Sequence, residues 1–288
     1  RQQRQWDLIQ LTGVDTLTAL STGAYVLAES YLYTVESMKD YLARLSPNGI
    51  LSFMVSDVNF GERQPPRFSL RHAANFYQAA KELGYADPAA HAVVLASAEG
   101  VPQVEIMFKK SPFQRSELLE LMRFARERDF RIWAMPGPGT RGPLNVILNV
   151  SPRQREHFFR SYPLDVRETR DDRHFFFQFF RWLDIFDVTR TELDRGHTGA
   201  TGQIVLVALL AFAILASLAL ILLPLSISQR IVVAAPDALR LATYFAAVGL
   251  GFMLVEISLI QRFILFLGHP TYSIATIKIG RASCRESV

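Results

Sequence analysis

A carboxylate and a group of tyrosines follow the first apolar stretch of the chain. The run Trp6–Leu11 predicts a buried strand, and Asp15 lies in the loop after it. Open α/β sheets bind ligands at the carboxyl ends of their strands, so Asp15 is a candidate site residue, although an Asx-turn explains it equally well. The aromatic and acidic side chains that follow could wall an amine pocket by cation–π contact, or could simply pack beneath the loop. They are Tyr25, Glu29, Tyr31 and Tyr33.

Two other acidic positions are candidates for a functional role. Asp57 ends the next predicted strand and could face the same pocket as Asp15. The cluster Asp171-Asp172-Arg173-His174 contains side chains that can bind metals, but one local segment lacks the spread of ligands found in most metal sites. A charged hinge that leads into an aromatic stretch resting near a membrane surface explains this cluster better.

Glu256 places a carboxylate inside an apolar stretch. Residues 203–225 contain no charge, and residues 241–260 are comparably apolar apart from Glu256. Each stretch is long enough to cross the ~30 Å hydrocarbon core of a bilayer as a helix. A carboxylate within a span is costly, so Glu256 should face neighbouring helices, with Gly249 and Gly251 permitting close packing. It could handle ions or protons, or form a structural bond between helices.

The elements before these spans alternate between strand and helix. Thr34 and Ser69 are predicted N-caps of two helices, and an apolar strand precedes each. This alternation indicates βαβ units on a parallel sheet. Residues 92–96 and 103–108 are joined by so short a link that they must pair antiparallel. We therefore predict an α/β fold, the C-terminal half of a methyltransferase-type Rossmann domain, followed by α-helical transmembrane segments.

The composition argues against several classes of protein. The net charge of +4 comes mostly from arginine. Arginines equal acidic residues in number between residues 151 and 200, so no basic stripe indicates nucleic-acid binding, and the basic excess is interpreted as a solubility and membrane-flank feature. The single cysteine, Cys284, excludes a disulfide framework and a cysteine metal cluster. The segment Gly137-Pro138-Gly139 precedes no helix and is expected to be a loop rather than a phosphate site.

Four regions are predicted along the chain. Residues 1–110 form a partial Rossmann domain, 111–200 an α/β extension and juxtamembrane segment, and 201–277 a transmembrane region with at least two helices. Residues 278–288 have the character of a non-native tail that interrupts a third apolar run. The abrupt start at Arg1 leads us to expect an internal fragment of a longer protein, with the Gly-rich cofactor turn and the ribose-binding acid upstream.

Five segments of the chain share their pattern with a known family. They are Trp6-Asp7-Leu8-Ile9-Gln10, Leu32-Tyr33-Thr34-Val35-Glu36, Leu45-Ser46-Pro47-Asn48-Gly49-Ile50-Leu51, Asp171-Asp172-Arg173-His174-Phe175-Phe176-Phe177 and Gly249-Leu250-Gly251-Phe252-Met253-Leu254-Val255-Glu256. Together these segments, which extend over most of the chain to about Ile277, resemble the spermidine synthase-like family of bacterial membrane proteins, relatives of the aminopropyltransferases.

The resemblance implies group transfer to an amine or another nucleophile. Aminopropyltransferases carry two aspartates three residues apart after the strand that matches residues 6–11; Thr12 occupies the first position here and Asp15 the second. Thr16 replaces the family's proline, and the family's glutamine after the next strand has no counterpart. Asp15 is thus expected to orient the nucleophile or accept its proton. The expected substrate-binding residues are Tyr25, Glu29, Tyr33 and Asp57.

The resemblance also implies a donor and a location. S-adenosylmethionine or its decarboxylated form is expected for the full-length protein, whereas this fragment alone should bind neither. The expected partners are a lipid bilayer and a small amine, without nucleic acid. The expected location is the bacterial inner membrane, multi-pass, with the soluble domain in the cytoplasm, where the donor is made. A second hypothesis is a non-catalytic ligand-binding or regulatory domain attached to a membrane bundle that performs transport.

Overall fold

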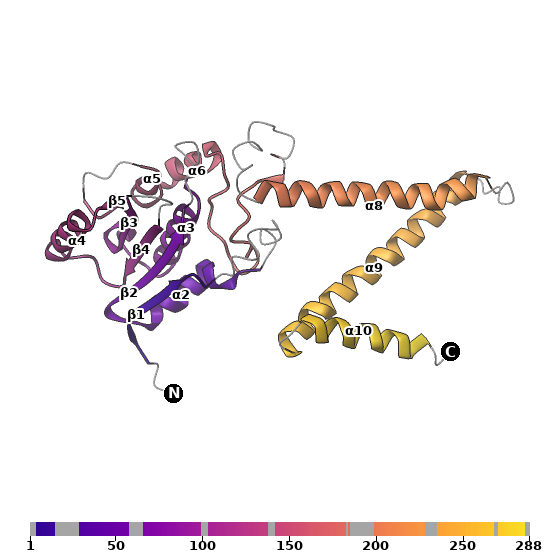
Figure 1. Ribbon diagram of the computed structural model, residues 1–288, viewed down its shortest axis with the longest axis horizontal. Helices are drawn as coiled ribbons and strands as arrows, with labels where there is room; N and C mark the ends of the chain where they lie inside the picture. The colour runs from indigo at the N-terminus through magenta and orange to yellow at the C-terminus, as the bar shows by residue number, and fades with distance from the viewer. Residues whose placement is uncertain are drawn as a thin grey trace. The chain divides into compact units, whose positions relative to one another are not determined.

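The computed structural model describes most of the chain, which divides into two compact units (Figure 1). The N-terminal unit is Arg1–Phe212 and the C-terminal unit is Ala213–Val288. The described residues are 4–14, 29–57, 66–98, 103–137, 142–182, 184, 199–227, 235–267 and 270–285.

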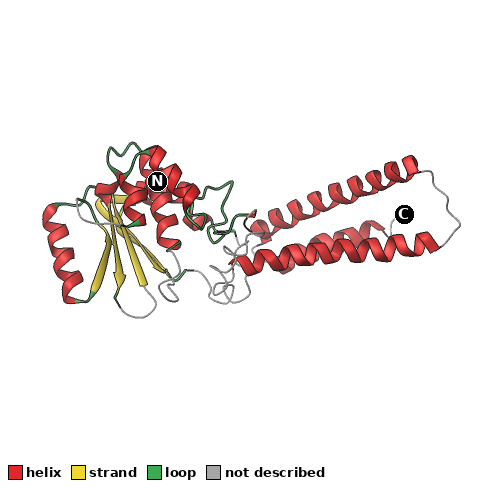
Figure 2. Cartoon of the chain, turned by 90° about the horizontal axis from the view of Figure 1, so that it is seen from above, coloured by secondary structure: helices red, strands yellow, loops and turns green. Residues whose placement is uncertain are grey.

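A mixed sheet organises the described part of the N-terminal unit (Figure 2). Its strands are β1 (Trp6–Thr12), β2 (Leu45–Ser56), β3 (Ala92–Ser97), β4 (Gln103–Lys109) and β5 (Phe130–Ala134). They lie in the order β1-β2-β4-β3-β5. β1 is parallel to β2, β4 is antiparallel to both β2 and β3, and β5 is antiparallel to β3. β2 and β3 therefore run parallel to each other, with the opposed strand β4 between them.

The predicted antiparallel hairpin is confirmed. In the register of β3 and β4, Val93 lies opposite Met107 and Leu95 opposite Glu105. The short link between the two strands leaves no room for the crossover that parallel pairing would need. The predicted α/β class is also confirmed in its coarse form: the sheet is mixed, helices pack on it, and the arrangement is compatible with a Rossmann-like fold.

Strand β2 begins earlier than the sequence predicts. The segment Ser46-Pro47-Asn48-Gly49 reads as a turn, but the structure places it within β2, where the pairing register with β1 shifts between Trp6 and Leu8. A glycine is required at position 49, because a Cβ atom there would lie 2.7 Å from the Trp6 carbonyl oxygen. An irregular pairing of this kind accommodates residues that would otherwise end a strand.

Helices pack against the sheet. Thr34 caps the first long helix as predicted, since its hydroxyl oxygen accepts a hydrogen bond from the backbone N–H of Ser37 at 3.2 Å. Ser69 is not a cap, because its helix already begins at Phe68. The helices are η2 (Tyr31–Tyr33), α2 (Val35–Arg44), α3 (Phe68–Glu82), η3 (Pro88–His91), α4 (Arg115–Glu127), α5 (Pro143–Asn149) and α6 (Pro152–Ser161).

The two faces of the sheet are covered unequally. Phe53 and Phe108 lie in the main core on the face that carries α2 and α3. The other face carries α4 (Figure 1), and there Val93 and Leu95 form a smaller cluster with Ala125 of α4. By the alternation of strand side chains, the residues of β1 and β2 on this second face include several exposed apolar ones. These are Trp6, Leu8 and Met54, which are 42%, 55% and 37% exposed.

The aromatic segment after α6 belongs largely to the core. Phe176, Phe177 and Phe179 are 1%, 9% and 4% exposed and join the main core cluster. The expectation that this stretch rests near a membrane surface is therefore wrong for these three side chains. Trp182 differs, because it is 47% exposed. A run of phenylalanines has no periodicity that separates core burial from interfacial burial, so only long-range packing decides between them.

The rest of the described chain is helical: α8 (Gly199–Ile227), α9 (Ala235–Leu267) and α10 (Pro270–Arg285). Within the described residues, Arg240–Ile264 is long and apolar enough to cross a membrane, and Ile204–Leu220 forms a shorter apolar stretch. The structure thus does not establish the predicted pair of spans. Helix α8 runs across the predicted boundary after residue 200 and α10 across that after residue 277, and the four predicted regions stay a prediction.

Glu256 lies on the less exposed side of α9. It is partly buried, as are Ile260 and Phe263 at four- and three-residue spacing, whereas Met253 is 50% exposed. At Gly249, the space within 4 Å of an added Cβ atom is empty. The partly buried side of α9 thus continues from Glu256 toward the C-terminal end of the helix, and the packing of Glu256 against neighbouring helices in a membrane stays a prediction.

Candidate functional site

The carboxyl ends of β1 and β2 lie at the same edge of the sheet, because the two strands are parallel. The residues predicted to act in the site follow these ends. Asp15 and Tyr25 lie outside the described residues, so their roles stay predictions. Glu29, Tyr33 and Asp57 are described, and the structure places them in three different environments.

Asp57 caps α3 instead of facing an open pocket. It is 1% exposed. Its Oδ1 accepts hydrogen bonds from the backbone N–H groups of Arg67 and Phe68 at 2.9 and 2.8 Å, and its Oδ2 accepts one from Ser69 at 2.8 Å. N–H groups at a helix N-terminus lack partners within the helix, and the helix dipole favours an anion there. This corrects the expectation that the Asp57 carboxylate contacts substrate.

We expect Asp57→Ala to lower the free energy of unfolding of the N-terminal unit by about 1–2 kcal/mol, because three N–H groups lose their acceptor. Asp57→Asn should cost less, since its carbonyl oxygen can still accept. Urea unfolding followed by circular dichroism measures both changes. Asp87→Ala is the matched control, because Asp87 caps only the short η3 through one bond to Ala89. Equal losses for Asp57→Ala and Asp87→Ala would contradict the capping role.

Tyr33 is a core residue. Its ring is 4% exposed and packs against Phe53, His72 and Phe176, with ring centroids 6.1, 5.1 and 4.6 Å away. Its carbonyl oxygen accepts a hydrogen bond from the Thr169 hydroxyl at 2.9 Å. The expectation that the Tyr33 ring walls a substrate pocket is therefore not supported, and the ring instead joins η2 to the core.

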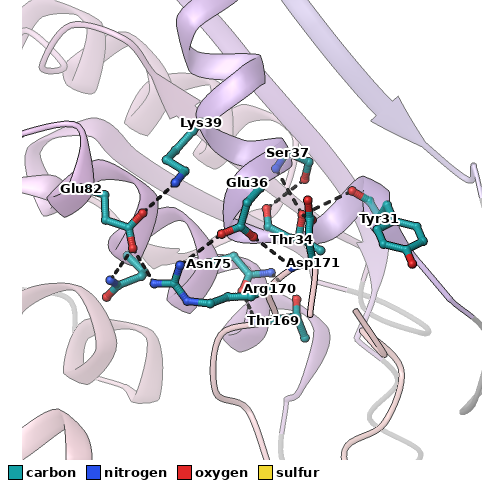
Figure 3. Close-up of polar contacts among 11 residues, drawn as sticks. Tyr31, Thr34, Glu36, Ser37, Lys39, Asn75, Glu82, Thr169, Arg170 and Asp171 are labelled. Carbon is teal, nitrogen blue, oxygen red and sulfur yellow. Dashed lines mark hydrogen bonds and ion pairs between the residues drawn. The ribbon is translucent and has the colours of Figure 1, made fainter. Parts of the chain in front are cut away.

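Polar contacts tie the segment before His174 to the start of α2 (Figure 3). The Thr34 hydroxyl donates to Asp171 Oδ1 at 2.7 Å. Glu36 accepts from the Asp171 backbone N–H and from the Arg170 guanidinium, both at 3.1 Å. Each contact joins residues that are far apart in sequence, so α2 helps to hold this segment in place.

Glu82 anchors the same segment from the end of α3 (Figure 3). Its carboxylate accepts hydrogen bonds from Lys39 at 2.8 Å, from Gln78 at 2.9 Å and from Arg170. Hydrogen bonds from Lys39, Arg170 and Gln78 lower the pKa of Glu82 to about 2. The carboxylate therefore stays ionised at neutral pH and holds Arg170 as a fixed charge.

His174 is brought next to Glu29 and Tyr31. Its Nδ1 lies 2.9 Å from the carbonyl oxygen of Asp171. Because a carbonyl can only accept, Nδ1 must carry the hydrogen, and Nε2 of the neutral ring then carries the lone pair. The ring stacks on Tyr31 with centroids 4.3 Å apart, and Nε2 lies 3.7 Å from Glu29 Oε1. Within the described residues, this buried Nε2 has no hydrogen-bond partner.

We call Glu29 and His174 the acceptor pair. Burial, followed by the Glu29 and Asp171 carboxylates, raises the pKa of Tyr31. The two nearby carboxylates favour a cation over an anion at this place. A neutral imidazole with a fixed tautomer can take a proton from a bound ammonium or hydroxyl, and a nearby carboxylate stabilises the imidazolium that forms. The acceptor pair therefore has the components of a general base for a nucleophile.

The sequence suggested Glu29 but not its partner. In the sequence His174 belongs to a local acidic cluster, and its separation from Glu29 hides the contact. The chain turns within this cluster, where the Arg173 N–H donates to the Arg170 carbonyl oxygen at 2.8 Å. The described residues bring together no group of His, Cys, Asp and Glu side chains suited to hold a metal ion.

Comparison with known proteins adds no assignment. Neither a protein-family model nor a curated protein sequence matches this chain. The site must therefore be interpreted from its own geometry.

Proposed function

We propose that this chain carries the acceptor side of a methyltransferase-type Rossmann domain, which transfers an aminopropyl or methyl group from an S-adenosyl donor to an amine or another nucleophile. The observation that carries the proposal is the acceptor pair, in which the buried Nε2 of His174 lies 3.7 Å from Glu29. The nature of the donor rests on the resemblance to spermidine synthase-like membrane proteins.

The order of the strands supports a methyltransferase-type domain. Strand β4 runs against its two neighbours and lies between the mutually parallel β2 and β3. In a methyltransferase-type domain the sheet is expected to end in a hairpin whose second strand inserts, antiparallel, between two parallel strands. In an open α/β sheet the ligand binds at the carboxyl ends of the parallel strands, where Thr12 and Asp57 stand here.

The exposed face of β1 and β2 supports the proposal that the domain has a further half. Parallel sheets in α/β proteins are covered on both faces, yet Trp6, Leu8 and Met54 are exposed on the face opposite α2 and α3. Such apolar side chains fit beneath a covering helix. We propose that a further segment of the polypeptide covers them, extends the sheet beyond β1 and holds the donor in its glycine-rich turn.

The acceptor pair accounts for the proton in the proposed reaction. The lone pair of the nucleophile attacks the carbon bonded to the donor sulfonium, the carbon–sulfur bond breaks, and its electrons remain on sulfur as a neutral thioether. The proton of the nucleophile passes to Nε2 of His174, and Glu29 stabilises the resulting imidazolium. Asp15, in the loop after β1, would help to hold the incoming cation.

Exposed apolar helices support a membrane anchor. In α8, Leu215 and Leu220 are 66% and 75% exposed, and in α9, Leu250 is 65% exposed. A helix that is apolar on all sides is either buried in protein or surrounded by lipid. We propose that α8 and α9 cross a bacterial inner membrane, with the N-terminal unit in the cytoplasm. Glu256 would then be an intramembrane carboxylate that faces other helices.

The test of group transfer uses the full-length polypeptide in detergent. It is incubated with S-adenosylmethionine or its decarboxylated form, labelled in the transferred group, and with a panel of diamines and polyamines. We expect label to appear in an amine product. The rate of transfer should be about 100-fold lower for His174→Gln, because the general base is lost. Glu29→Gln should raise the KM for the amine. His157→Gln, at an exposed histidine of α6, is the control.

Transfer that is unaffected by His174→Gln would contradict the role of the acceptor pair. Donor binding without transfer to any amine would favour the second candidate, a non-catalytic binding domain attached to the membrane helices. One observation favours that candidate: Asp57, the acid that follows β2, is fully occupied by the backbone of α3. Binding of an amine to the full-length protein without turnover would support it.

A further inference from the structure

A cavity of about 410 Å³ lies in the N-terminal unit, on the segment that follows α6. Arg71 of α3 contributes to its wall, and the other lining residues come from positions 165–182. Glu29, Tyr31 and His174 do not line it, so it is distinct from the acceptor pair. Its volume falls within the range of about 300–1,000 Å³ that is typical of small-molecule sites.

Of the arginines in the cavity wall, Arg167 and Arg181 pair with Glu156 and Asp184, whereas Arg71 and Arg173 have no carboxylate in ion-pair contact among the described residues. Arg71 is 2% exposed, and its guanidinium bonds only to carbonyl oxygens, including that of Arg167 at 3.1 Å. Carbonyl groups satisfy the donors but leave the charge in place. The Arg173 side chain forms no hydrogen bond or ion pair with another described residue, although it lines the cavity and is exposed. An oxyanion in the cavity could therefore bond to Arg173 and feel the charge of Arg71.

Negative charge lines the same cavity. The carboxylates of Glu168 and Asp172 form no hydrogen bond or ion pair with another described side chain, and neither comes within ion-pair distance of Arg173. Opposite charges that share a cavity without pairing attract a ligand that carries both signs. A purely anionic ligand would be repelled by the two acids, and a purely cationic one by Arg71 and Arg173.

Aromatic and amide groups complete the wall. Trp182 is 47% exposed and lines the cavity together with Phe175. The faces of such rings bind ammonium groups by cation–π attraction. Gln178, which also lines the cavity, offers an amide that can donate to an oxyanion. The cationic end of a ligand is thus expected near Trp182 and the acids, and its anionic end near Arg173.

We propose that this cavity binds a small zwitterion that joins an ammonium group to a phosphate. The planar guanidinium of Arg173 bonds the phosphate oxygens, and Glu168 and Asp172 neutralise the ammonium. Two sources supply this chemistry: a free aminoalkyl phosphate, or the headgroup of an aminophospholipid. The site is separate from the proposed group transfer, and either can fail without the other.

The test is isothermal titration calorimetry on the full chain in detergent, with O-phosphoethanolamine, inorganic phosphate and ethanolamine as separate probes. We expect O-phosphoethanolamine to bind at least 10-fold more tightly than either fragment. Arg173→Gln should weaken its binding about 10-fold, and so should the double variant Glu168→Gln, Asp172→Asn. The double variant should not weaken the binding of inorganic phosphate. Arg153→Gln, at an exposed arginine of α6 that does not line the cavity, should leave binding unchanged.

A second measurement separates the two sources. Native mass spectrometry of the full chain with added phosphatidylethanolamine or phosphatidylglycerol reports retained lipid. Preferential retention of phosphatidylethanolamine that is lost in Arg173→Gln identifies the headgroup, whereas binding of O-phosphoethanolamine alone identifies a soluble ligand. Inorganic phosphate binding as tightly as O-phosphoethanolamine overturns the proposal. The absence of binding in both measurements also overturns it. So does an unchanged affinity for O-phosphoethanolamine in Arg173→Gln or in the double variant, provided that the melting temperature shows the variant to be folded.

Discussion

Replacing Arg71 by Met is expected to lower the free energy of unfolding of the N-terminal unit by about 3–5 kcal/mol, because several carbonyl acceptors lose hydrogen bonds from a charged group and each such loss costs about 1–3 kcal/mol. Arg71 donates to the carbonyl oxygens of Arg167 at 3.1 Å and of Phe175 at 3.4 Å, and also to those of Asp165 and Phe176. Met keeps much of the unbranched stem but leaves these buried acceptors without donors. Urea unfolding monitored by circular dichroism measures the loss.

Two further variants make this prediction specific. Arg71→Lys should recover only part of the stability, because one ammonium cannot reach carbonyls on two separate stretches of chain. Arg153→Met, at an exposed arginine, should change stability by less than about 0.5 kcal/mol. Limited proteolysis should also cut residues 165–181 faster in Arg71→Met, since the guanidinium clamps this segment to α3. Wild-type resistance in that variant would mean that aromatic packing alone holds the segment.

Acid is expected to destabilise the N-terminal unit through His72 well before the carboxylates titrate. His72 is completely buried, and its ring lies 4.5 Å from that of Phe53 and 4.7 Å from that of Phe176. Within the described residues, neither of its ring nitrogens has a hydrogen-bond partner. Burial, and secondarily the charge of Arg71, lowers the pKa of His72 from 6.5 to about 3. The folded protein therefore holds a neutral imidazole.

The direction of the pH effect follows from the two pKa values of His72. Between pH 6.5 and 3 the unfolded chain binds a proton at this residue that the folded chain does not. The free energy of unfolding should therefore fall by about 1.4 kcal/mol per pH unit below 6.5, or about 2 kcal/mol by pH 5. Glu82 and Glu156, with pKa values lowered to about 2, contribute stability that is lost only as the pH falls through 4.5 toward 2.

His72→Phe should remove most of this dependence between pH 7 and 5. Phe has nearly the same shape and lacks the two unpaired nitrogens, so we also expect higher stability at pH 7 by about 1–3 kcal/mol. Denaturant midpoints at pH 7, 6 and 5 measure both effects. His157→Gln, at an exposed histidine, should keep the acid sensitivity of the wild type. An unchanged slope in His72→Phe would assign the acid sensitivity to another group.

Local pattern was sufficient for several elements. The helix after Thr34 and the hairpin of residues 92–96 and 103–108 follow from apolar spacing, a capping hydroxyl and a short link, all of which act over a few residues. The start of β2 does not follow from local pattern, because Pro47 and Gly49 are local turn signals, whereas the pairing with Trp6 that overrides them is a contact with a distant strand.

The sequence by itself determined the α/β alternation, the antiparallel hairpin and the apolar character of the last helices, because each depends on periodicity or composition. Only the tertiary structure decided what the charged and polar groups do. Asp57 binds the backbone of α3, Arg71 holds carbonyls of a distant segment, and His174 meets Glu29. A charged side chain looks the same in sequence whether it faces water, a backbone group or a ligand. Contacts between distant elements determine its partner, because the cost of burying a charge is offset only where the fold places a partner beside it.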